Sequence, residues 1–512
     1  MSRESLEFDV VIVGAGPAGL ATAVRLTQLS AANDLELAIA VVEKGAEVGA
    51  HIVSGAVIEP HALAELLPDW RERGAPAGLE VSDERFHWLT SNERSFAVPR
   101  ALLPRPLRND GNRIVSLGRL CRWLAAEAEA LGVDLLTGFA ATELIVERQR
   151  VAGVLTGPHG IGADGTPKPG ADPGYELRAK YVVLAEGCRG HLGQRAEREF
   201  GLRDGIDPQH YGIGFKEVWI VPEAHEAPGR VEHTAGWPLD DRTEGGGFVY
   251  HAGERRLSVG FVVALNYRNP HLDPFKEFQR WKTHPRIRSL LDGGERIGFG
   301  ARAVNKGGLG SLPRLDFPGG LLVGCDAGFL NGAKIKGTHT AIKSGLLAAE
   351  TIADALQADR GGGRALDGYG ERVASSSLHG ELYAARNFSA GIARFGVRIG
   401  GAVAFVEHNL LRGRAPWRID HSTPDHAMLE TVQQAEPIGY PAPDGKLTFD
   451  RLASIHLANI EHAEDQPVHL LLGDASVPIR QNLARYGEPA ERYCPAGVYE
   501  IIAEPGGPRF QI

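Results

Sequence analysis

The sequence of 512 residues predicts an α/β fold, in which a parallel-sheet domain carries a second, antiparallel sheet inserted into it. Three observations lead to this prediction. An apolar run at 10–13 ends in a Gly-x-Gly-x-x-Gly pattern, a second apolar run at 37–42 ends in Glu43, and residues 211–269 read as paired strands. A glycine pattern between a strand and a helix, followed by an acidic residue after the next strand, is typical of dinucleotide-binding domains.

The glycine pattern consists of Gly14, Gly16 and Gly19. The first glycine makes a tight turn, the second admits a pyrophosphate close to the backbone, and the third lets the next helix pack on the strand. That helix, expected over 18–29, aims its N-terminal N–H groups at the phosphates, and Glu43 is placed to accept from ribose hydroxyls. A Rossmann-type domain with a bound dinucleotide is therefore predicted. The alternative is a glycine-rich turn in an ordinary βαβ unit.

Composition excludes several classes of protein. Lys and Arg number 55 against 64 Asp and Glu, and the formal net charge of −9 argues against a nucleic-acid partner. The N-terminus shows no signal or transit peptide, and no uncharged run of about 18 apolar residues predicts a spanning helix. Four widely spaced cysteines do not suggest a disulfide framework, so a reduced protein facing the cytoplasm is expected.

The remaining elements follow from local patterns. The first half should contain a helix at 117–130, strands near 133–136 and 143–146, a Gly/Pro/Asp-rich loop at 156–174 and a buried strand at 181–187. The second half should contain strands at 212–221, 245–251 and 255–265, the last two as a hairpin, then a helix with Asp273 as N-cap and Pro274 at N1. A strand and turn at 321–328 and a helix from Gly337 to Leu356 return the chain to the first domain.

Two of these segments favour FAD over NAD as the dinucleotide. AEGCRG at 185–190 and LVGCDAG at 322–328 resemble the later flavin-contacting strands of the glutathione-reductase-like FAD superfamily. A second glycine fingerprint after a strand and the CxxxxC pair of disulfide reductases are both absent from the sequence. Electrons are therefore expected from a donor other than NAD(P)H.

Six further blocks carry a more specific resemblance. They are GAHIVSGA (49–56), YGIGFKEVW (211–219), ARAVNKGGLGSLP (301–313), NGAKIKGTHTAIKSG (331–345), DQPVHLLL (465–472) and RYCPAGVYE (492–500). Together they resemble the electron-transfer flavoprotein–ubiquinone oxidoreductase family over essentially the whole chain. The resemblance implies an FAD enzyme on a membrane face, which takes single electrons from reduced electron-transfer flavoprotein and passes them to ubiquinone. It also implies a 4Fe–4S cluster in a C-terminal ferredoxin-like domain.

The resemblance implies that the chain is divided into four regions. They are a discontinuous FAD-binding domain (1–210 and 311–385), an inserted ubiquinone-binding β domain (211–310), a membrane-associated helical segment (386–430) and an incomplete iron–sulfur domain (431–512). The implied location is the cytoplasmic face of a bacterial inner membrane, or the matrix side of the mitochondrial inner membrane for a eukaryotic protein. Peripheral, monotopic membrane association is expected.

One departure from the family concerns the cysteines. The family places one cluster ligand in the CPAGVYE block, here Cys494, and three more in a downstream CxxCxxC block that lies beyond Ile512. The other cysteines, Cys121, Cys188 and Cys325, are not in CxxC spacing. Because a cluster needs four thiolates, the sequence is interpreted as a fragment of a longer protein. On its own it is expected to bind FAD but no iron.

The resemblance also supplies the other site residues. Asp326 is placed at the ribityl–phosphate region of FAD, with a capping role as the alternative. The helix opened by Gly337 and Thr338 should face the flavin N1/O2 edge, with Lys334 and Lys336 adding positive charge, although an ordinary helix start would look the same. The remaining glycines implied in cofactor binding are Gly49, Gly55 and Gly187.

The predicted quinone contact is a glycine pair, Gly307 and Gly308, which lets a flat ring approach the backbone. A plain turn is the alternative. His51 and His339 are candidate proton donors to the reduced quinone, with structural roles as the alternative for both.

Residues 391–411 predict a helix with one apolar face and surrounding arginines, as an interface-lying helix near anionic lipid requires. A core-packed amphipathic helix is the alternative. The apolar residues are Ile392, Phe395, Ile399, Val403, Val406 and Leu410, and the arginines are Arg386, Arg394, Arg398, Arg412, Arg414 and Arg418. Two other functions stay open: a cluster-free FAD-dependent reductase or hydroxylase of an isoprenoid or aromatic substrate, and a flavin subunit that uses a separate ferredoxin-like partner.

Overall fold

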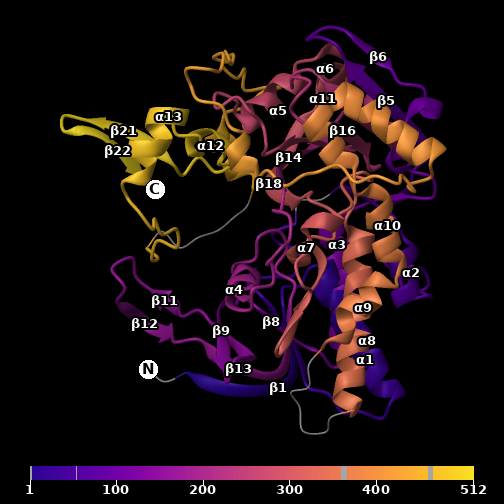
Figure 1. Ribbon diagram of the computed structural model, residues 1–512, viewed down its shortest axis with the longest axis vertical. Coiled ribbons are helices and arrows are strands. Elements are labelled where there is room, and N and C mark those ends of the chain that lie inside the picture. The colour runs from indigo at the N-terminus through magenta and orange to yellow at the C-terminus, as the bar shows by residue number, and fades with distance from the viewer. Residues whose placement is uncertain (1–2, 53–54, 359–365, 459–464) are drawn as a thin grey trace.

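The computed structural model describes residues 3–52, 55–358, 366–458 and 465–512. Figure 1 shows a lower lobe around β1, β8 and β13 and an upper lobe around β14, β16 and β18. The C-terminal region projects to one side of the two lobes. Its elements are α12 (Arg451–His456), η7 (Pro478–Leu483), α13 (Ala484–Tyr486), α14 (Ala490–Tyr493), β21 (Glu500–Glu504) and β22 (Gly507–Gln511).

The lower lobe contains the predicted parallel sheet. Along its path the strands are β19 (Asp316–Phe317), β20 (Gly320–Leu322), β13 (Tyr175–Leu184), β1 (Glu4–Val13), β2 (Ile39–Glu43) and β8 (Asp134–Thr137). The central strands are apolar because helices cover the sheet: Val10 to Val13 of β1 are all buried. The helices include α1 (Pro17–Ala32), α3 (Leu117–Ala130) and α8 (Thr338–Ala358), and α1 packs along α8. The predicted Rossmann-type α/β fold is confirmed.

The upper lobe contains a seven-stranded sheet. Its order is β18 (Glu295–Asn305), β14 (Tyr211–Ile220), β17 (Arg256–Ala264), β16 (Gly245–His251), β15 (Arg230–Gly236), β5 (Asp83–Leu89) and β6 (Ser95–Ala97). The expected hairpin of β16 and β17 is present. Asp273 caps α5 (Pro274–Lys282), whose Phe278 and Trp281 are fully buried in the core of this lobe together with Ile287 of α6 (Pro285–Leu291).

Two features of the fold differ from the expectations. Strands β5 and β6 come from residues 83–97, before the inserted segment, and β5 pairs in parallel with β15. Residues 156–174 form a hairpin of β11 (His159–Ile161) and β12 (Pro167–Asp172), not only a loop. The Gly/Pro/Asp-rich composition predicts a loop, whereas Gly165, with φ of +81°, lies in the turn between the two short strands.

Three charged side chains are buried together in the upper lobe. Lys282 Nζ lies 2.9 Å from a Glu217 carboxylate oxygen, and an Arg296 guanidinium nitrogen lies 3.2 Å from the other. The side chains are 0%, 0% and 4% exposed for Glu217, Lys282 and Arg296. Trp219 Nε1 also donates to Glu217, so the carboxylate is saturated with donors.

The predicted helix at 391–411 is interrupted. After α9 (Gly368–Ala374) and α10 (Ser377–Ala385), α11 (Phe388–Phe405) kinks at Gly396, whose φ is +83°. The kink forms because Asp241 accepts hydrogen bonds from the backbone N–H groups of Val397 and Arg398, which are thereby withdrawn from the helix. A π-helical turn, η5 (Val406–Leu410), ends the segment, so the expectation of one regular helix is wrong.

Several further elements complete the described part of the chain. They are β3 (Ala56–Ile58), β4 (Leu79–Glu80) and β7 (Arg113–Val115) in a three-stranded sheet, β9 (Ala141–Glu147) and β10 (Arg150–Thr156) beside β13, the helices α2 (His61–Leu66), α4 (His191–Glu199) and α7 (Gly324–Ala327), and the short turns η1 (Arg100–Leu102), η2 (Arg105–Leu107), η3 (Glu223–His225), η4 (Leu309–Ser311) and η6 (Asp425–Met428).

Candidate functional site

The glycine turn lies at the carboxyl end of β1 and connects this strand to α1. Gly14 has φ of +108°, and a Cβ built there would lie 2.4 Å from the Ala185 carbonyl oxygen. A Cβ at Gly19 would lie 2.1 Å from the Gly14 carbonyl oxygen. The fold itself therefore requires glycine at both positions.

Gly16 differs from its two neighbours in the pattern. Its backbone is extended, with φ of −83°, and a Cβ built there meets no heavy atom within 4 Å. Neither backbone conformation nor packing explains this glycine. Close approach of a ligand to the backbone does explain it, and a pyrophosphate at the start of α1 is such a ligand. The cradle therefore fits a dinucleotide.

Glu43 ends β2 next to this turn. One carboxylate oxygen accepts from Ala15 N at 3.1 Å and the other from Gly45 N at 2.8 Å, so the side chain is fixed beside the glycine pattern. Gly49 and Gly55 follow, with φ of +84° and +91°. Of the GAHIVSGA block, residues 53 and 54 lie outside the described part of the chain.

Sequence analysis missed a cation that reaches this region from the other lobe. Arg302, on β18, donates to the His51 carbonyl oxygen at 3.0 Å, and its guanidinium lies 3.3 Å from the position of a Cβ at Gly187. Gly187 itself has φ of +88° after β13. No local pattern marks Arg302, because the contact joins segments that are far apart in the sequence.

Asp326 lies inside α7, where Val323 is the N-cap, so it does not cap that helix. Its carboxylate accepts from Glu186 N at 3.3 Å, in the turn after β13. Burial and the neighbouring Glu186 charge raise its pKa well above the ordinary value. The residue therefore joins the ends of two adjacent strands at the edge of the sheet where α/β proteins bind ligands.

The start of α8 holds the segment expected at the flavin. The helix begins at Thr338, and Thr340 Oγ1 donates to the Gly337 carbonyl oxygen. Burial lowers the pKa of Lys336 to about 8. Lys336 Nζ donates to the Lys334 carbonyl oxygen at 3.0 Å, so it is held close to this helix start.

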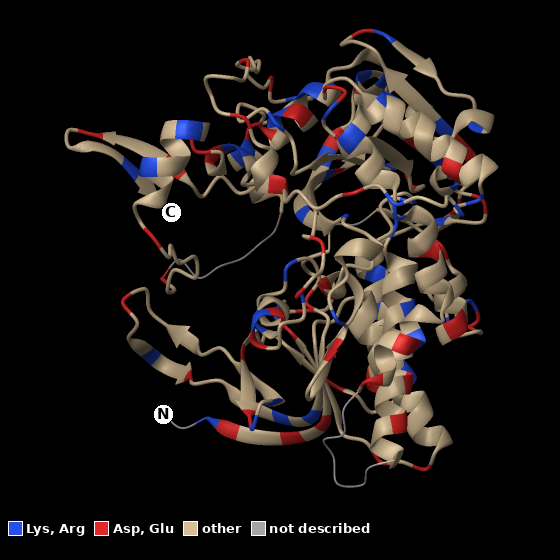
Figure 2. Ribbon diagram, in the orientation of Figure 1, with Lys and Arg blue, Asp and Glu red and all other residues tan. Residues whose placement is uncertain are grey.

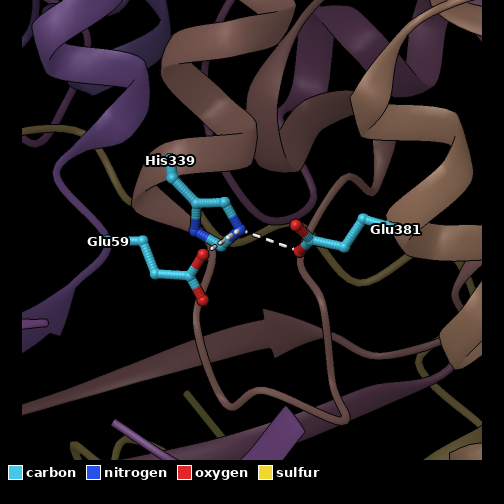
Figure 3. Close-up of side chains that lie close together, drawn as sticks. All are labelled: Glu59, His339 and Glu381. Atoms are coloured by element: carbon cyan, nitrogen blue, oxygen red, sulfur yellow. Dashed lines mark hydrogen bonds and ion pairs between the residues drawn. The ribbon is translucent and has the colours of Figure 1, made fainter. Parts of the chain in front are cut away.

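A buried cluster of charged side chains surrounds His339, the second residue of α8 (Figure 3). His339 Nε2 lies 2.8 Å from a Glu381 oxygen and 3.9 Å from a Glu59 oxygen. The three groups lie close enough together to ligate a metal ion. Lys334 Nζ, however, donates to Glu59 at 2.9 Å and to Glu381 at 2.8 Å, so an ammonium already neutralises both carboxylates. We therefore interpret the cluster as an ion-pair network that joins the loop before α2 to α8 and α10.

This network predicts a pH dependence of stability. Burial opposes ionisation of Glu381, but hydrogen bonds and charges from His339 and Lys334 outweigh it and lower its pKa from 4.5 to about 2. The contribution to the free energy of unfolding, on the order of 3 kcal/mol, is complete above the unfolded pKa and is lost as the pH falls through the folded pKa. The free energy of unfolding, measured with urea, should fall between pH about 5 and pH about 3. This fall should be smaller for Glu381→Gln than for the wild type. Glu72→Gln, at an exposed position, should behave like the wild type.

The predicted quinone pair lies after β18. Gly307 N donates to Gln209 Oε1 at 2.9 Å, and Gly308 has φ of +66°, which glycine accommodates. The two residues line a cavity of about 10 Å³ with Leu330 and Asn331. That volume holds about one water molecule, so a quinone ring would require this wall to open.

Cys494 lies apart from the other three cysteines. Cys494 ends α14 in the C-terminal region, whereas Cys121, Cys188 and Cys325 belong to the lower lobe. Burial raises the pKa of Cys121 and Cys188 to about 12 and also raises that of Cys325, which makes them poor thiolate ligands. Residues 1–512 thus offer one of the four thiolates that a 4Fe–4S cluster needs.

The interrupted helix of α11 and η5 exposes an apolar face. The face consists of Phe395, Ile399, Val406 and Leu410, which are 40%, 60%, 40% and 66% exposed. Glu407 and His408 point inward instead: Asn387 Nδ2 and Trp417 Nε1 donate to Glu407, and burial lowers the pKa of His408 to about 4. Figure 2 shows that the α11 ribbon carries few charged residues. By length and composition alone, the helical stretch Ser377–Leu410 could also cross a membrane.

The arginines around this face have different surroundings. Arg398 pairs with Asp241, Arg418 pairs with Asp207, and Arg386 donates to the carbonyl oxygen of Ala415. Arg394, Arg412 and Arg414 are exposed. Arg398 and Arg418 are exposed as well, so most of the predicted basic cluster faces solvent, and Arg386 is half-buried against backbone carbonyl groups.

Comparison with known proteins first defines the class. Residues 12–73 match an NAD(P)-binding Rossmann-like family model. A geranylgeranyl bacteriochlorophyll reductase-like protein of Thermoplasma acidophilum has a TM-score of 0.61 and 18% identity, over 80% of this chain and 96% of its own. The flavin-dependent brominase Bmp2 has a TM-score of 0.52 and 15% identity, over 83% of this chain and 97% of its own. At these identities the likeness shows the fold alone, and this chain shares that fold with enzymes that include a flavin-dependent brominase.

The family follows from two further family models and from relatives. Residues 211–304 match the model "ETF-QO, ubiquinone-binding", and residues 445–512 match "Electron transfer flavoprotein-ubiquinone oxidoreductase, 4Fe-4S". The Pseudomonas aeruginosa electron transfer flavoprotein-ubiquinone oxidoreductase is 53% identical over all of this chain and 94% of its own. The human mitochondrial protein of the same name is 47% identical over all of this chain and 84% of its own. The chain belongs to the electron transfer flavoprotein–ubiquinone oxidoreductase family, as the sequence blocks predicted.

Proposed function

We propose that this chain takes electrons from reduced electron-transfer flavoprotein and delivers them to ubiquinone at a membrane surface. Family membership over the whole chain carries the proposal, and the glycine cradle around Gly16 supports it. FAD, when bound, supplies exchange of one or two electrons at a time. The two open alternatives, a cluster-free hydroxylase and a flavin subunit with a separate partner, lose ground because residues 445–512 match a 4Fe-4S model of this family.

The lower lobe supplies the residues for the flavin. Gly14, Gly16 and Gly19 would hold the pyrophosphate and Glu43 the adenosine ribose. The start of α8 would place positive backbone N–H groups against the flavin, where they favour negative charge. The other residues that we assign to this cofactor are Gly49, Gly55, Gly187, Asp326, Gly337 and Thr338.

Ubiquinone takes up two electrons and two protons. We assign its ring to the wall formed by Gly307 and Gly308, where backbone without side chains lets a flat ring approach. Asn331 of that wall donates to Glu381 at 2.8 Å, so the ion-pair network of His339 adjoins the proposed ring site. The network holds the α8 start in place, and His339 is the residue that could pass a proton toward this wall.

We further propose that α11 and η5 rest on the bilayer surface. We also propose that the chain is divided into domains as the sequence predicts. The parts are the FAD-binding domain (1–210 and 311–385), the ubiquinone-binding domain (211–310), the membrane-associated segment (386–430) and the iron–sulfur region with Cys494 (431–512). The inward-facing Glu407 and His408 support a lipid-facing apolar face. The cytoplasmic face of a bacterial inner membrane is the proposed location.

Membrane association can be tested with Ile399→Asp. A charge in place of a 60%-exposed apolar residue should weaken binding to phospholipid vesicles about tenfold or more, because apolar contact is replaced by a desolvation cost. Vesicle cosedimentation measures this change. Ile206→Asp makes the same substitution at another exposed isoleucine, 38% exposed, and should bind like the wild type. Equal weakening by both variants would contradict the assignment of this face.

The activity itself can be tested in a reconstituted assay. The protein, loaded with FAD, is mixed with reduced electron-transfer flavoprotein and a short-chain ubiquinone, and quinone reduction is followed by absorbance. We expect turnover that needs both partners. Oxidation of the flavoprotein without quinone reduction would contradict the proposed acceptor. Quinone reduction by NADH alone would contradict the proposed donor.

A further inference from the structure

A cavity of about 560 Å³ opens between α2, η2 and the loop at 108–112. Its volume lies in the range of small-ligand sites. Arg71, Arg105 and Arg108 line it, together with Lys334 and two carboxylates, those of Glu59 and Asp110. Lys334, expected to add positive charge near the flavin, lines this cavity, but none of the glycines assigned to FAD or to the quinone ring does.

The charges around this cavity do not balance. Glu59 pairs with Lys334 at 2.9 Å, and Asp110 pairs with Arg100, so both carboxylates are already neutralised. Within the described part of the chain, no carboxylate lies within ion-pair distance of Arg71, Arg105 or Arg108. Arg71 only stacks on the Trp70 ring at 4.3 Å, and Arg108 Nε is buried without a hydrogen-bond partner. Three guanidinium groups that converge without counter-ions favour an anion.

The anion that guanidinium forks fit best is a phosphate or a carboxylate, because paired N–H groups match two oxygens at once. The position of the cavity indicates which kind of anionic ligand it binds. Arg105 N donates to Asn409 Oδ1 at 2.9 Å, and Asn409 Nδ2 donates to the Leu103 carbonyl oxygen at 3.0 Å. These bonds fix one wall of the cavity to η5, at the end of the apolar face.

Large apolar side chains lie exposed on both sides of these bonds. Leu102 is 58% exposed and Leu410 is 66% exposed, and each is adjacent in sequence to a residue that makes one of the two bonds. A ligand with an anionic head and an apolar tail fits this arrangement, since the head meets the arginines and the tail meets the leucines. A free anion would leave the apolar side chains unused.

We propose that this cavity binds the phosphate head group of an anionic phospholipid, with the acyl chains lying on the apolar face of η5. The inference deepens the proposed membrane association and rests on it for its biological setting. A basic pocket at a membrane surface is the arrangement that recognises anionic head groups. The site would bind specific lipid molecules, beyond the general attraction of exposed arginines to a charged bilayer.

The test uses soluble lipids, so that binding in the cavity is measured without a bilayer. Dihexanoyl-phosphatidylglycerol, dihexanoyl-phosphatidylcholine and inorganic phosphate are titrated calorimetrically into the FAD-loaded protein. We expect the phosphatidylglycerol to bind more tightly than either of the others. Arg71→Gln/Arg105→Gln, at two exposed positions where folding is preserved, should weaken that binding about tenfold or more. Arg108→Gln should weaken it as well.

A matched control removes the same charge outside the cavity. Arg394→Gln/Arg412→Gln changes two exposed arginines near the apolar face, and it should leave the affinity for the soluble lipid unchanged. If both double variants lost the same affinity for the soluble lipid, the proposed site would be ruled out in favour of general electrostatic attraction. If inorganic phosphate bound as tightly as the phosphatidylglycerol, the proposal of a lipid ligand would be overturned in favour of a free anion. If vesicle binding fails but the soluble lipid binds through the cavity arginines, only the proposed membrane association is overturned.

Discussion

Gly16→Ala should fold and fail to retain FAD. The added methyl group meets no atom within 4 Å in the protein, and the backbone angle of −83° suits alanine, so stability should change little. The same methyl would occupy the space that a pyrophosphate needs next to the backbone. We expect FAD affinity to fall about 100-fold, equivalent to roughly 2.7 kcal/mol. Flavin absorbance per protein and fluorescence titration of the apoprotein with FAD measure the effect.

Other glycines provide controls for this result. Gly401→Ala also places its methyl in open space, and this variant should bind FAD like the wild type. Gly14→Ala and Gly19→Ala force a Cβ to within 2.4 and 2.1 Å of a carbonyl oxygen, so they should lower thermal stability as well as flavin content. If Gly16→Ala retained full flavin occupancy, that result would contradict the assignment of the pyrophosphate to this turn.

Glu217→Gln should destabilise the protein by about 3–5 kcal/mol, because it leaves Lys282 and Arg296 as buried cations without a counter-ion. Burial already lowers the pKa of Lys282 to about 8 against the opposing effect of the Glu217 charge, and the variant removes that charge. Denaturant unfolding monitored by tryptophan fluorescence measures the loss, since Trp219 contacts the same carboxylate.

Two companion variants separate the buried charge from the general effect of the substitution. Glu147→Gln breaks an ion pair with Arg178 in which the glutamate is 53% exposed, and it should cost less than about 1 kcal/mol. Glu217→Gln/Lys282→Met removes one of the stranded cations and should recover part of the lost stability. A loss of under about 1 kcal/mol for Glu217→Gln would contradict the view that these charges depend on one another.

Local patterns in the sequence predicted much of the fold. The glycine turn, the apolar strands on both sides of it, the hairpin of β16 and β17 and the Asp273 cap are all short-range features, so a single chain segment contains the information. The strand pattern at 211–269 predicted the inserted sheet, and the family resemblance added its ubiquinone-binding role and the C-terminal region. Both the Rossmann-type fold and the family are confirmed by the comparisons.

Long-range contacts could not be read from the sequence. The network of Glu59, His339 and Glu381 joins a loop and two helices that are far apart in the sequence, and no local spacing connects them. Arg302 likewise reaches the lower lobe from the upper sheet. The kink at Gly396 depends on Asp241, which lies on a distant loop, so residues 391–411 alone predict a regular helix. The assignment of individual residues to FAD and to ubiquinone stays a prediction.

The pairing of β5 with β15 has a consequence for synthesis of the chain. Strand β5 leaves the ribosome long before β15, whose first residue, Arg230, pairs with Asp83. At typical translation rates roughly 10 s separate the two strands, and throughout that time β5 has no native partner on this edge. An unpaired strand edge can pair with other chains. Nascent chains of this protein should therefore need chaperone protection until residue 236 has emerged, and the upper lobe cannot fold as an independent unit before that point.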